Sequence, residues 1–181
     1  ELTGRQFRFE TIGGGEAIGL TGTGLMSAVR TLREAGVIEA NGRLRSDHPL
    51  VQNRRVQLSE RIGLTQWDVR DLQKAKGAIR AAIDILLETL SLTAGDLDRV
   101  ILTGSFGGRV DPQDALGIGM LPPVRPAIIE SIPNGAGYGA ASFLSDAGFS
   151  RAEALARRAE HINLDASRAF MERFAAALSF V

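Results

Sequence analysis

The sequence predicts an α/β fold in which helices flank a mixed sheet. Two apolar runs of strand length, Val100–Thr103 and Ala127–Ile132, each lead into a glycine-rich stretch and then into a helical pattern. A third glycine-rich stretch, Gly22–Gly24, also opens a helical pattern. Strands that alternate with helices are typical of α/β proteins, and ligands in such proteins gather where strand ends face helix starts.

The composition is that of an ordinary globular domain. The 181 residues are 44% hydrophobic and 23% charged, and a chain of this length buries a sizeable core. The 21 basic and 21 acidic residues give a formal net charge of zero, so no basic excess indicates a nucleic-acid partner. No apolar run approaches the roughly 20 residues of a membrane span. We therefore expect a cytoplasmic protein that contacts neither nucleic acid nor membrane.

Cysteine is absent and histidine occurs only twice. The chain thus offers no disulfide, no thiol nucleophile and no ligands for an iron–sulfur cluster, and no residues have metal-ligand spacing. The first residue is Glu1, and no signal peptide is visible. We expect residues 1–181 to be part of a longer protein, cut at a domain boundary.

The most informative stretch is Val100–Pro112, VILTGSFGGRVDP. Its uninterrupted apolar start, Val100–Thr103, is typical of a strand buried on both faces. The glycines of Gly104–Gly108 permit a sharp turn and a close approach to a ligand. Asp111 and Pro112 then have the chemistry of a helix N-cap and first helical residue. This order predicts a phosphate or sugar site, and the alternative is a tight turn without a ligand.

The N-terminal part contains a predicted strand and helix. Gln6–Ile12 alternates apolar and polar residues, as a half-buried strand does. Leu25–Ala35 has apolar residues at helical spacing. The preceding Gly22-Thr23-Gly24 is too short for a dinucleotide fingerprint, so a helix N-cap at Thr21 or Thr23 is the simpler interpretation.

The longest predicted helix begins at Thr65, where Thr65 and Asp68 have the spacing of a capping box, and ends near Leu90. Its expected buried stripe is Val69, Leu72, Ala75, Ile79, Ile83 and Leu86 or Leu87. Gly77 inside this helix predicts close approach by another backbone or a ligand.

Three cations lie beside Gly77, namely Lys74, Lys76 and Arg80. Lys76 and Arg80 share one face of the helix, one turn apart. Taken without further context, they indicate a solvated basic face.

The other expected elements are a strand at Arg55–Leu58, a helix at Asp111–Ile118, a helix from the Asn134–Gly139 stretch to about Leu144, a helix at Ser150–Ala159, an edge strand at Glu160–Leu164 and a helix at Ala166–Leu178. The small residues at 134–141 predict that the first of these C-terminal helices packs closely against a sheet or a ligand.

Five segments carry a resemblance to a known family: IGLTGTGLMSAV (18–29), LTQWDVRDLQKAKGAIRAAIDILL (64–87), DRVILTGSFGGRVDPQDALGIGMLPP (98–123), NGAGYGAASFLS (134–145) and ERFAAALSF (172–180). The chain resembles the C-terminal domain of the reductive activators of corrinoid proteins, which are ferredoxin-containing ATPases. Their nucleotide domain belongs to the superfamily of acetate and sugar kinases, heat-shock chaperones and actin. The resemblance implies a ribonuclease-H-like, actin-like ATPase lobe that lacks the ferredoxin domain and the first lobe.

The resemblance also implies nucleotide contacts, which fall into four groups. These are Gly104, Ser105, Phe106, Gly107 and Gly108 as the adenosine motif; Lys74, Lys76 and Arg80 on the helix beside adenine and ribose; Gly22, Thr23 and Gly24 near the base or phosphates; and Asn134 and Gly135 at the start of a helix behind the site.

Two parts of the family pattern are missing from this chain. The superfamily's phosphate-binding hairpins, with an Asp before a Gly/Thr-rich turn, hold magnesium and orient the attacking water, and none is found here. The two-iron two-sulfur ferredoxin domain needs Cys ligands that this chain lacks. ATP or ADP with magnesium, and the cluster, are thus expected of the parent protein, and this chain alone is expected not to hydrolyse ATP.

The implied activity of the parent is ATP-dependent reduction of a cobalt(II) corrinoid to cobalt(I) with iron–sulfur electrons. The implied partner is the corrinoid protein of a methyltransferase system, and a homodimer is one possible assembly. No catalytic residue is expected in this half of the site.

Three alternatives compete with this interpretation. An ATP-dependent activator of a radical dehydratase would need Cys in the nucleotide domain, and the chain has none. A non-catalytic interaction domain would keep the fold, with Phe106 filling the adenine space. A dinucleotide oxidoreductase would need an acid about 20 residues after the glycine loop at the end of a strand, whereas Glu39 follows a helix into a polar turn.

Overall fold

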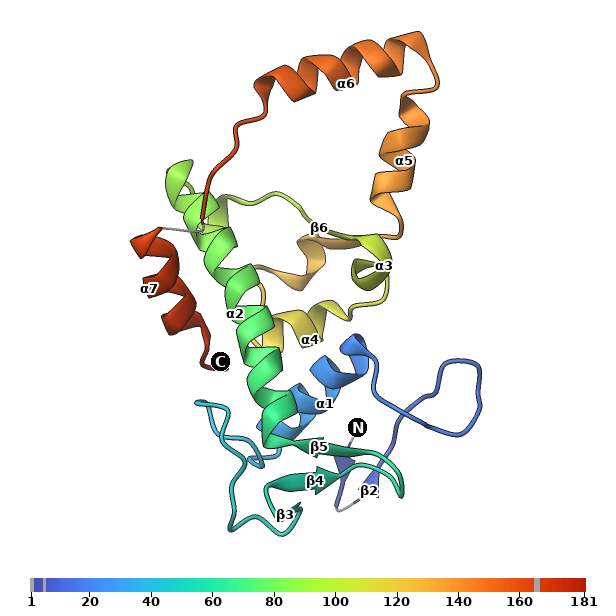
Figure 1. Cartoon of the computed structure of the whole chain (residues 1–181), viewed down its shortest axis with the longest axis vertical. Helices are drawn as coiled ribbons and strands as arrows, with labels where there is room; N and C mark the ends of the chain where they lie inside the picture. Colours follow the sequence, from blue (N-terminus) through green and yellow to red (C-terminus); the bar gives the residue numbers. More distant parts are fainter. Residues whose placement is uncertain (1, 5, 165–166) are drawn as a thin grey trace.

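A long helix, α2 (Gln66–Thr89), runs through the middle of the molecule, and other elements pack along it (Figure 1). The computed structural model describes residues 2–4, 6–164 and 167–181, with only the backbone of residues 105 and 106. The helix begins at the predicted capping box. The Asp68 backbone N–H donates to Thr65 Oγ1 at 3.3 Å, and the Thr65 backbone N–H donates to Asp68 Oδ2 at 2.7 Å.

The other elements fall on either side of α2 in the sequence. Those before it are β1 (Leu2–Thr3), β2 (Gln6–Phe7), α1 (Gly22–Glu34), β3 (Val51–Gln52), β4 (Arg55–Gln57) and β5 (Gly63–Thr65). Those after it are the 3-10 helix η1 (Ala94–Asp96), β6 (Val100–Thr103), α3 (Gly104–Gly107), α4 (Pro112–Gly117), the 3-10 helix η2 (Pro126–Ile128), β7 (Ile129–Ile132), α5 (Gly135–Ser142), α6 (Asp146–Arg158) and α7 (Arg168–Ala177).

The strands form small sheets of both kinds. β1 pairs with β2, and β3, β4 and β5 form an antiparallel sheet in which Val56 lies opposite Leu64. β6 and β7 are parallel, with Val100 opposite Ile129 and Thr103 opposite Ile132. Because parallel strands end at the same edge of a sheet, the stretches that follow β6 and β7 start side by side.

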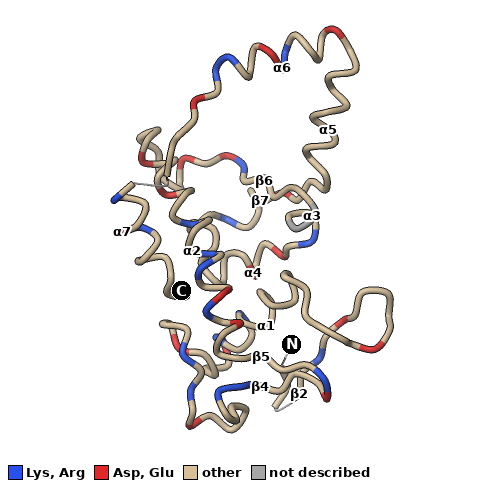
Figure 2. Tube along the Cα trace, viewed as in Figure 1, with Lys and Arg blue, Asp and Glu red and all other residues tan. Residues whose placement is uncertain are grey.

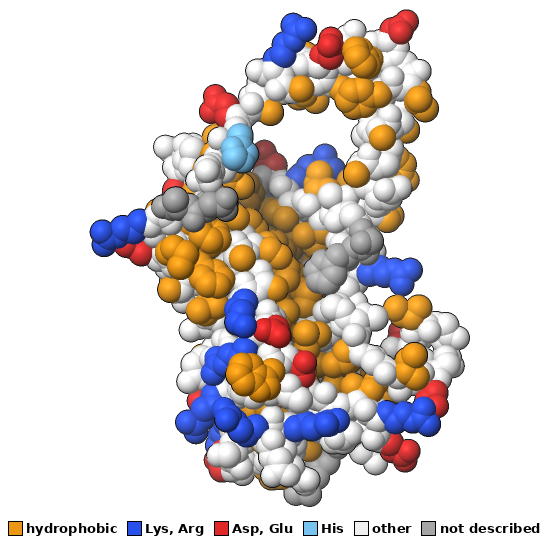
Figure 3. Space-filling view, in the orientation of Figure 1, with side chains coloured by type: hydrophobic (Ala, Val, Ile, Leu, Met, Phe, Trp, Pro, Cys, Tyr) orange, Lys and Arg blue, Asp and Glu red, His pale blue; other side chains and the backbone are white. Residues whose placement is uncertain are grey.

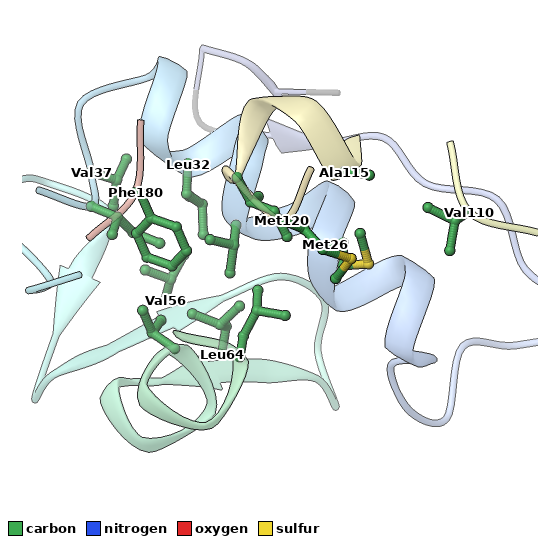
Figure 4. Packing of buried hydrophobic residues seen from close by; sticks show 14 of the residues in the cluster. Met26, Leu32, Val37, Val56, Leu64, Val110, Ala115, Met120 and Phe180 are labelled. Carbon is green, nitrogen blue, oxygen red and sulfur yellow. The ribbon is translucent and has the colours of Figure 1, made fainter. Parts of the chain in front are cut away.

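One apolar cluster joins α1, the β4–β5 hairpin, the start of α2 and the C-terminal end of the chain. Figure 4 shows Met26, Leu32, Val56, Leu64 and Phe180 within it, and all five are buried. Val29 and Leu32 on α1 are fully buried, which confirms the helical stripe predicted for this segment. The cluster therefore holds α1 against α2 and the hairpin.

The buried stripe of α2 differs from the predicted one beyond its second turn. Val69 and Leu72 are buried as expected, but Ile79 is 43% exposed. The residues buried after Leu72 are Gln73, Lys76, Gly77, Ala81 and Ile85. The cause is α7 and the chain end, which pack on this face. A Cβ added to Gly77 would lie 3.4 Å from the Ala177 carbonyl oxygen, so the predicted close backbone approach at Gly77 is confirmed.

Several other expectations change. β6 is not buried on both faces, since Ile101 is exposed and β7 is the strand that pairs with it among the described residues. The stretch after β6 contains a helical turn, α3, rather than an open loop. The predicted strand at 6–12 is only Gln6–Phe7, and Glu160–Leu164 is irregular backbone instead of an edge strand. Residue 166, the expected start of the last helix, lies outside the described residues.

Two helices, α5 and α6, extend away from the body of the molecule (Figure 1). Figure 2 shows no charged residue along α5, as expected of a helix that is buried. However, Tyr138 is exposed, and Leu144, just after the helix, is 89% exposed. The expectation that α5 packs closely is therefore confirmed only at its first residue, where Gly135 meets Thr103. Within the part of the chain that the structure describes, no helix is both long and apolar enough to cross a membrane.

Candidate functional site

The three glycine-rich stretches converge on one open hollow of about 630 Å³. Its described lining residues are Ile12, Thr21, Gly22, Thr23, Gly104, Gly108, Arg109, Pro133 and Asn134. They come from the segment before α1, the start of α1, the α3 turn and the start of α5. The structure thus brings together stretches that are far apart in the sequence, at the edge where β6 and β7 end.

The start of α1 forms one wall of the hollow. Thr21 is the N-cap, and the Gly24 backbone N–H donates to its Oγ1 at 3.0 Å, which confirms one of the two predicted N-caps. The hydroxyl groups of Thr21 and Thr23 lie 3.0 Å apart. The positive end of the α1 dipole therefore opens into the hollow, together with two hydroxyl groups.

The turn after β6 forms the second wall, and close contacts require glycine at two of its three glycine positions. A Cβ added to Gly107 would lie 2.8 Å from the backbone carbonyl carbon of Leu102, and one added to Gly108 would lie 3.0 Å from Pro133 Cβ. Gly104 has a φ of +90°, a conformation that favours glycine, and a Cβ added there would meet no atom within 4 Å. Gly104 is thus the glycine that presents open backbone to the hollow.

The start of α5 forms the third wall. Asn134 adopts a left-handed conformation, with a φ of 54°, and its side-chain oxygen accepts a hydrogen bond from the Gly137 backbone N–H at 3.2 Å. The Gly135 backbone N–H donates to Thr103 Oγ1 at 2.8 Å. A Cβ on Gly135 would clash with that same oxygen. Thr103, at the end of β6, therefore fixes the position of this helix start.

Arg109 is the one charged residue among the described residues that line the hollow, and the sequence-based assignment missed it. No hydrogen bond or ion pair joins its side chain to another described residue. Its position directly after the glycine stretch was the available signal. Two helix starts, with their positive dipole ends, and one cation give the hollow groups that suit an anionic ligand.

A buried carboxylate connects α4 to α1 behind the first two walls. Asp114 on α4 accepts hydrogen bonds from the Ser27 hydroxyl and from Arg30 Nε, the latter at 2.6 Å. Hydrogen bonding to Asp114 raises the pKa of the Arg30 guanidinium above its ordinary value. This cluster holds the two helices in fixed relation, and Ser27 and Arg30 lie on the same helix as Thr23.

The three cations of α2 do not line the hollow. Lys76 is 1% exposed, donates a hydrogen bond to the Ser179 carbonyl oxygen and lies 5.1 Å from the centre of the Phe180 ring. Lys74 is exposed and pairs with Asp71 at 3.0 Å. Arg80 pairs with Asp84 at 2.9 Å and donates to the Leu121 carbonyl oxygen at 3.1 Å.

Lys76 was therefore wrongly expected on a solvated face. Lys76 is buried because the end of the chain packs on α2, and the sequence around Lys76 does not show this contact. Contacts of Lys74, Lys76 and Arg80 with a nucleotide stay a prediction.

The remaining predicted site residues lie just behind the walls. Gly24 is within the first turn of α1, and Gly107 packs against β6. The backbone of Ser105 and Phe106 belongs to α3, and the side chains of both lie outside the described residues. The expected contact of Phe106 with the adenine space concerns a side chain outside the described residues.

The comparison with protein families decides the membership of the chain. Residues 2–181 match the family described as the C-terminal domain of RACo, the ASKHA domain. The chain belongs to this family. Membership in the RACo C-terminal family confirms the actin-like ATPase fold that the sequence resemblance implied.

Named relatives agree with this membership. The chain is 30% identical over 190 residues to the corrinoid activation enzyme RamQ of Eubacterium limosum. The matched region covers 92% of this chain and 32% of RamQ. It is 34% identical over 117 residues to the [Co(II) methylated amine-specific corrinoid protein] reductase of Methanosarcina barkeri, covering 65% of this chain and 20% of the reductase.

A solved structure shares the arrangement of elements. The chain superposes on a reductive activator for corrinoid, iron–sulfur protein with a TM-score of 0.82 and 26% identity, covering 96% of this chain and 30% of the activator. The chain thus spans about a third or less of the length of the relatives it matches.

Proposed function

We propose that the protein containing this chain is an ATP-dependent reductive activase that returns cobalt(II) corrinoid proteins to cobalt(I), and that this chain supplies one half of its nucleotide site. The observation that carries the proposal is the convergence of the stretches at 21–24, 104–108 and 134–135 on one hollow. Relatives of the RACo C-terminal family that are named for corrinoid activation support the choice of reaction.

The hollow is large enough for a nucleotide and has several groups that suit its phosphates. Its volume of about 630 Å³ lies within the roughly 300–1,000 Å³ of small-ligand sites. The helix starts at Thr21 and Asn134 and the guanidinium of Arg109 are suited to phosphate oxygens. Gly104 leaves its backbone open to a ligand. In this arrangement the chain binds and orients the nucleotide, and the opposite wall comes from the rest of the protein.

The residues of this chain do not fit a magnesium ion or an iron–sulfur cluster. Magnesium takes oxygen ligands, with carboxylates prominent among them, but none of the described lining residues is Asp or Glu. No group of three or more His, Asp or Glu in the described ranges is arranged to hold a metal ion. The sequence has no Cys for a cluster. We therefore assign hydrolysis and electron transfer to other parts of the parent protein.

The expected consequence of nucleotide binding is a change between two arrangements of the ATPase lobes. A nucleotide that contacts both lobes binds the closed arrangement more tightly than the open one, and it favours the closed arrangement by this difference in affinity. In this proposal, the closed arrangement changes how the activase contacts the corrinoid protein of a methyltransferase system. A homodimer and a cytoplasmic location belong to the same proposal.

The first test is calorimetric titration of the chain with ADP and ATP, with and without magnesium. We expect weak binding of both nucleotides that does not depend on magnesium, because no carboxylate is found among the described residues that line the hollow. Gly104→Val should abolish binding. The matched control is Gly36→Val, since Gly36 also has a positive φ, of 70°, and open space around it but lies at the far end of α1.

Loss of binding in both variants would mean that backbone strain alone is responsible. Absence of binding in the unmodified chain and also in the full-length protein would contradict the proposal and favour the interaction domain. The reaction itself is tested with the full-length protein, by following the absorbance of a corrinoid protein from cobalt(II) to cobalt(I) with ATP and a reductant.

A further inference from the structure

Trp67, in the first turn of α2, is 77% exposed although tryptophan usually buries most of its large apolar surface. It lies beside the β3–β5 sheet, whose other face is buried through Val56 and Leu64. We use the name Trp67 face for the surface made of Trp67, Arg54, Arg55 and Arg70. None of these four residues is among those that line the hollow.

Backbone contacts gather these residues. The Gln66 backbone N–H donates to the Arg54 carbonyl oxygen at 3.2 Å, and Arg55 pairs with Thr65, the N-cap of α2. Arg70 follows Trp67 by one turn of the helix. Figure 3 shows several Lys and Arg side chains on this lower part of the molecule, with a hydrophobic side chain among them.

The arginines of this face have no carboxylate partner in the part of the chain that the structure describes. Among residues 2–4, 6–164 and 167–181, no Asp or Glu forms an ion pair with Arg54, Arg55 or Arg70. Arg70 donates instead to the Asn41 carbonyl oxygen at 2.6 Å and to Gln73 Oε1 at 2.7 Å. The Arg55 guanidinium lies over Gly63, where an added Cβ would clash with its Nε.

Three carboxylates close in sequence to these residues have other partners. Asp68 closes the capping box of α2, and Asp71 pairs with Lys74. Glu39 lies 3.7 Å from Arg43. The local charge of the Trp67 face is therefore positive, although the whole chain has a formal net charge of zero.

The turn between β3 and β4 adds one more observation. Asn53 and Arg54 both have left-handed backbones, with φ of 51° and 59°. Such two-residue turns favour Asn followed by Gly, because a left-handed conformation is unfavourable for most residues that carry a side chain. Here an exposed arginine occupies the second position, at the tip of the turn.

We propose that the Trp67 face is a docking site for an acidic surface of a partner protein. Trp and Arg are the residues that contribute most to protein interfaces, and unpaired guanidinium groups are matched by carboxylates. Proteins that bind a nucleic-acid backbone carry a basic excess, whereas this chain has a formal net charge of zero. An acidic patch on a protein is therefore a better match for this face than a nucleic acid. The identification of this partner with the corrinoid protein rests on the proposed function.

The test uses Trp67 itself, because it is the only tryptophan in the chain and its fluorescence reports on this face alone. The probe is a glutamate peptide of about ten residues at low salt, with a lysine peptide of equal length as its counterpart. We expect the glutamate peptide to change the emission of Trp67 and added salt to reverse the change. The double variant Arg54→Glu/Arg55→Glu should lower the affinity by about tenfold or more.

The matched control is Arg151→Glu/Arg158→Glu on α6, which reverses two exposed arginines with no ion pair among the described residues. Circular dichroism shows whether both variants fold. Equal losses in the two double variants, or no preference for glutamate over lysine, would overturn the proposal. So would tighter binding of duplex DNA or of anionic vesicles than of the glutamate peptide.

A second measurement separates this proposal from the proposed function. In the full-length protein, Arg54→Glu/Arg55→Glu should slow cobalt reduction when the concentration of the corrinoid protein is low. The rate should recover when that concentration is raised, because only docking is weakened. Reduction at an unchanged rate would overturn the docking site while the function stands. Arginine-dependent binding of acidic probes without any cobalt reduction would keep the docking site and contradict the function.

Discussion

The side-chain amine of Lys76 donates a hydrogen bond to the backbone carbonyl oxygen of Ser179. This contact joins the middle of α2 to the last residues of the chain. Beside it, the Phe180 ring inserts into the core, and the Phe180 backbone N–H donates to the Ala40 carbonyl oxygen at 2.8 Å. The end of the chain is thereby held by polar and apolar contacts together.

The burial of Lys76 should make the stability of the fold depend on pH. Burial, with a smaller contribution from the charge of Arg80, lowers the pKa of Lys76 from 10.5 to about 8. Between these values the unfolded chain binds more protons than the folded one, so the free energy of unfolding rises as pH increases from about 8 to about 10.5. We expect a gain of about 1–3 kcal/mol, measured by urea unfolding across this range.

Lys76→Met is the control for this pH dependence, because methionine has similar length and no titrating group. The variant should show a smaller rise in unfolding free energy over the same pH range. An identical rise in the variant and the unmodified chain would assign the effect to other groups.

The glycines around the hollow should differ sharply in their tolerance of a methyl group. Gly107→Ala places a Cβ 2.8 Å from the Leu102 backbone, so we expect a loss of about 1–3 kcal/mol in unfolding free energy. Gly139→Ala, within α5, meets no atom within 4 Å and should raise helix stability by about 0.5–1 kcal/mol. Thermal unfolding of the two variants measures both effects, and similar shifts would contradict the packing described for β6 and α3.

The starts of two helices and the convergence of the glycine stretches were predictable from the sequence, whereas α6 begins at Asp146 and not at the expected Ser150. Thr65 with Asp68, and Asp111 with Pro112, form their caps through residues close in the chain, so local chemistry determines them. The stretches at 104–108 and 134–135 meet because parallel strands end at one edge of a sheet.

The second half of α2 was not predictable in the same way. Which of its faces is buried depends on α7 and Phe180, about 100 residues later in the chain, and local periodicity contains no trace of that contact. Arg109 was missed for another reason. The glycine pattern that predicts the site ends at Gly108, and the charged residue that follows it directly also lines the hollow.

Asp114 should be the most sensitive carboxylate in the described part of the chain. It is buried and accepts hydrogen bonds from Ser27 and Arg30. Asp114→Ala leaves both donors without this acceptor, and we expect the free energy of unfolding to fall by about 2–4 kcal/mol. The loss should not be larger, because the Arg30 guanidinium still pairs with Glu34 at 2.9 Å and is partly exposed to solvent. Asp71→Ala, which removes an exposed partner of Lys74, should change stability by less than about 1 kcal/mol.

Chemical denaturation of these two variants gives the comparison directly. Equal, small losses would mean that the Asp114 cluster does not hold α4 to α1. Asp114→Asn keeps the shape of the side chain and one acceptor oxygen, so it should fall between the two.

Arg109 should contribute to nucleotide affinity through its charge. Arg109 lines the hollow and its guanidinium pairs with no other described residue, so it is available to phosphate oxygens. Arg109→Gln should weaken ADP binding by about fivefold to a hundredfold while leaving the unfolding free energy within about 0.5 kcal/mol. It should also reduce the dependence of affinity on salt concentration, because one charge–charge interaction is removed.

Arg151→Gln on α6 serves as the comparison, since it removes the same charge from an exposed surface outside the hollow. Titration of both variants with ADP and with adenosine distinguishes the phosphate from the nucleoside. A loss confined to ADP places the phosphates beside Arg109. An equal loss for adenosine would mean that the guanidinium contacts the base or the ribose, and the helix starts at Thr21 and Asn134 would then face the nucleoside end of the ligand.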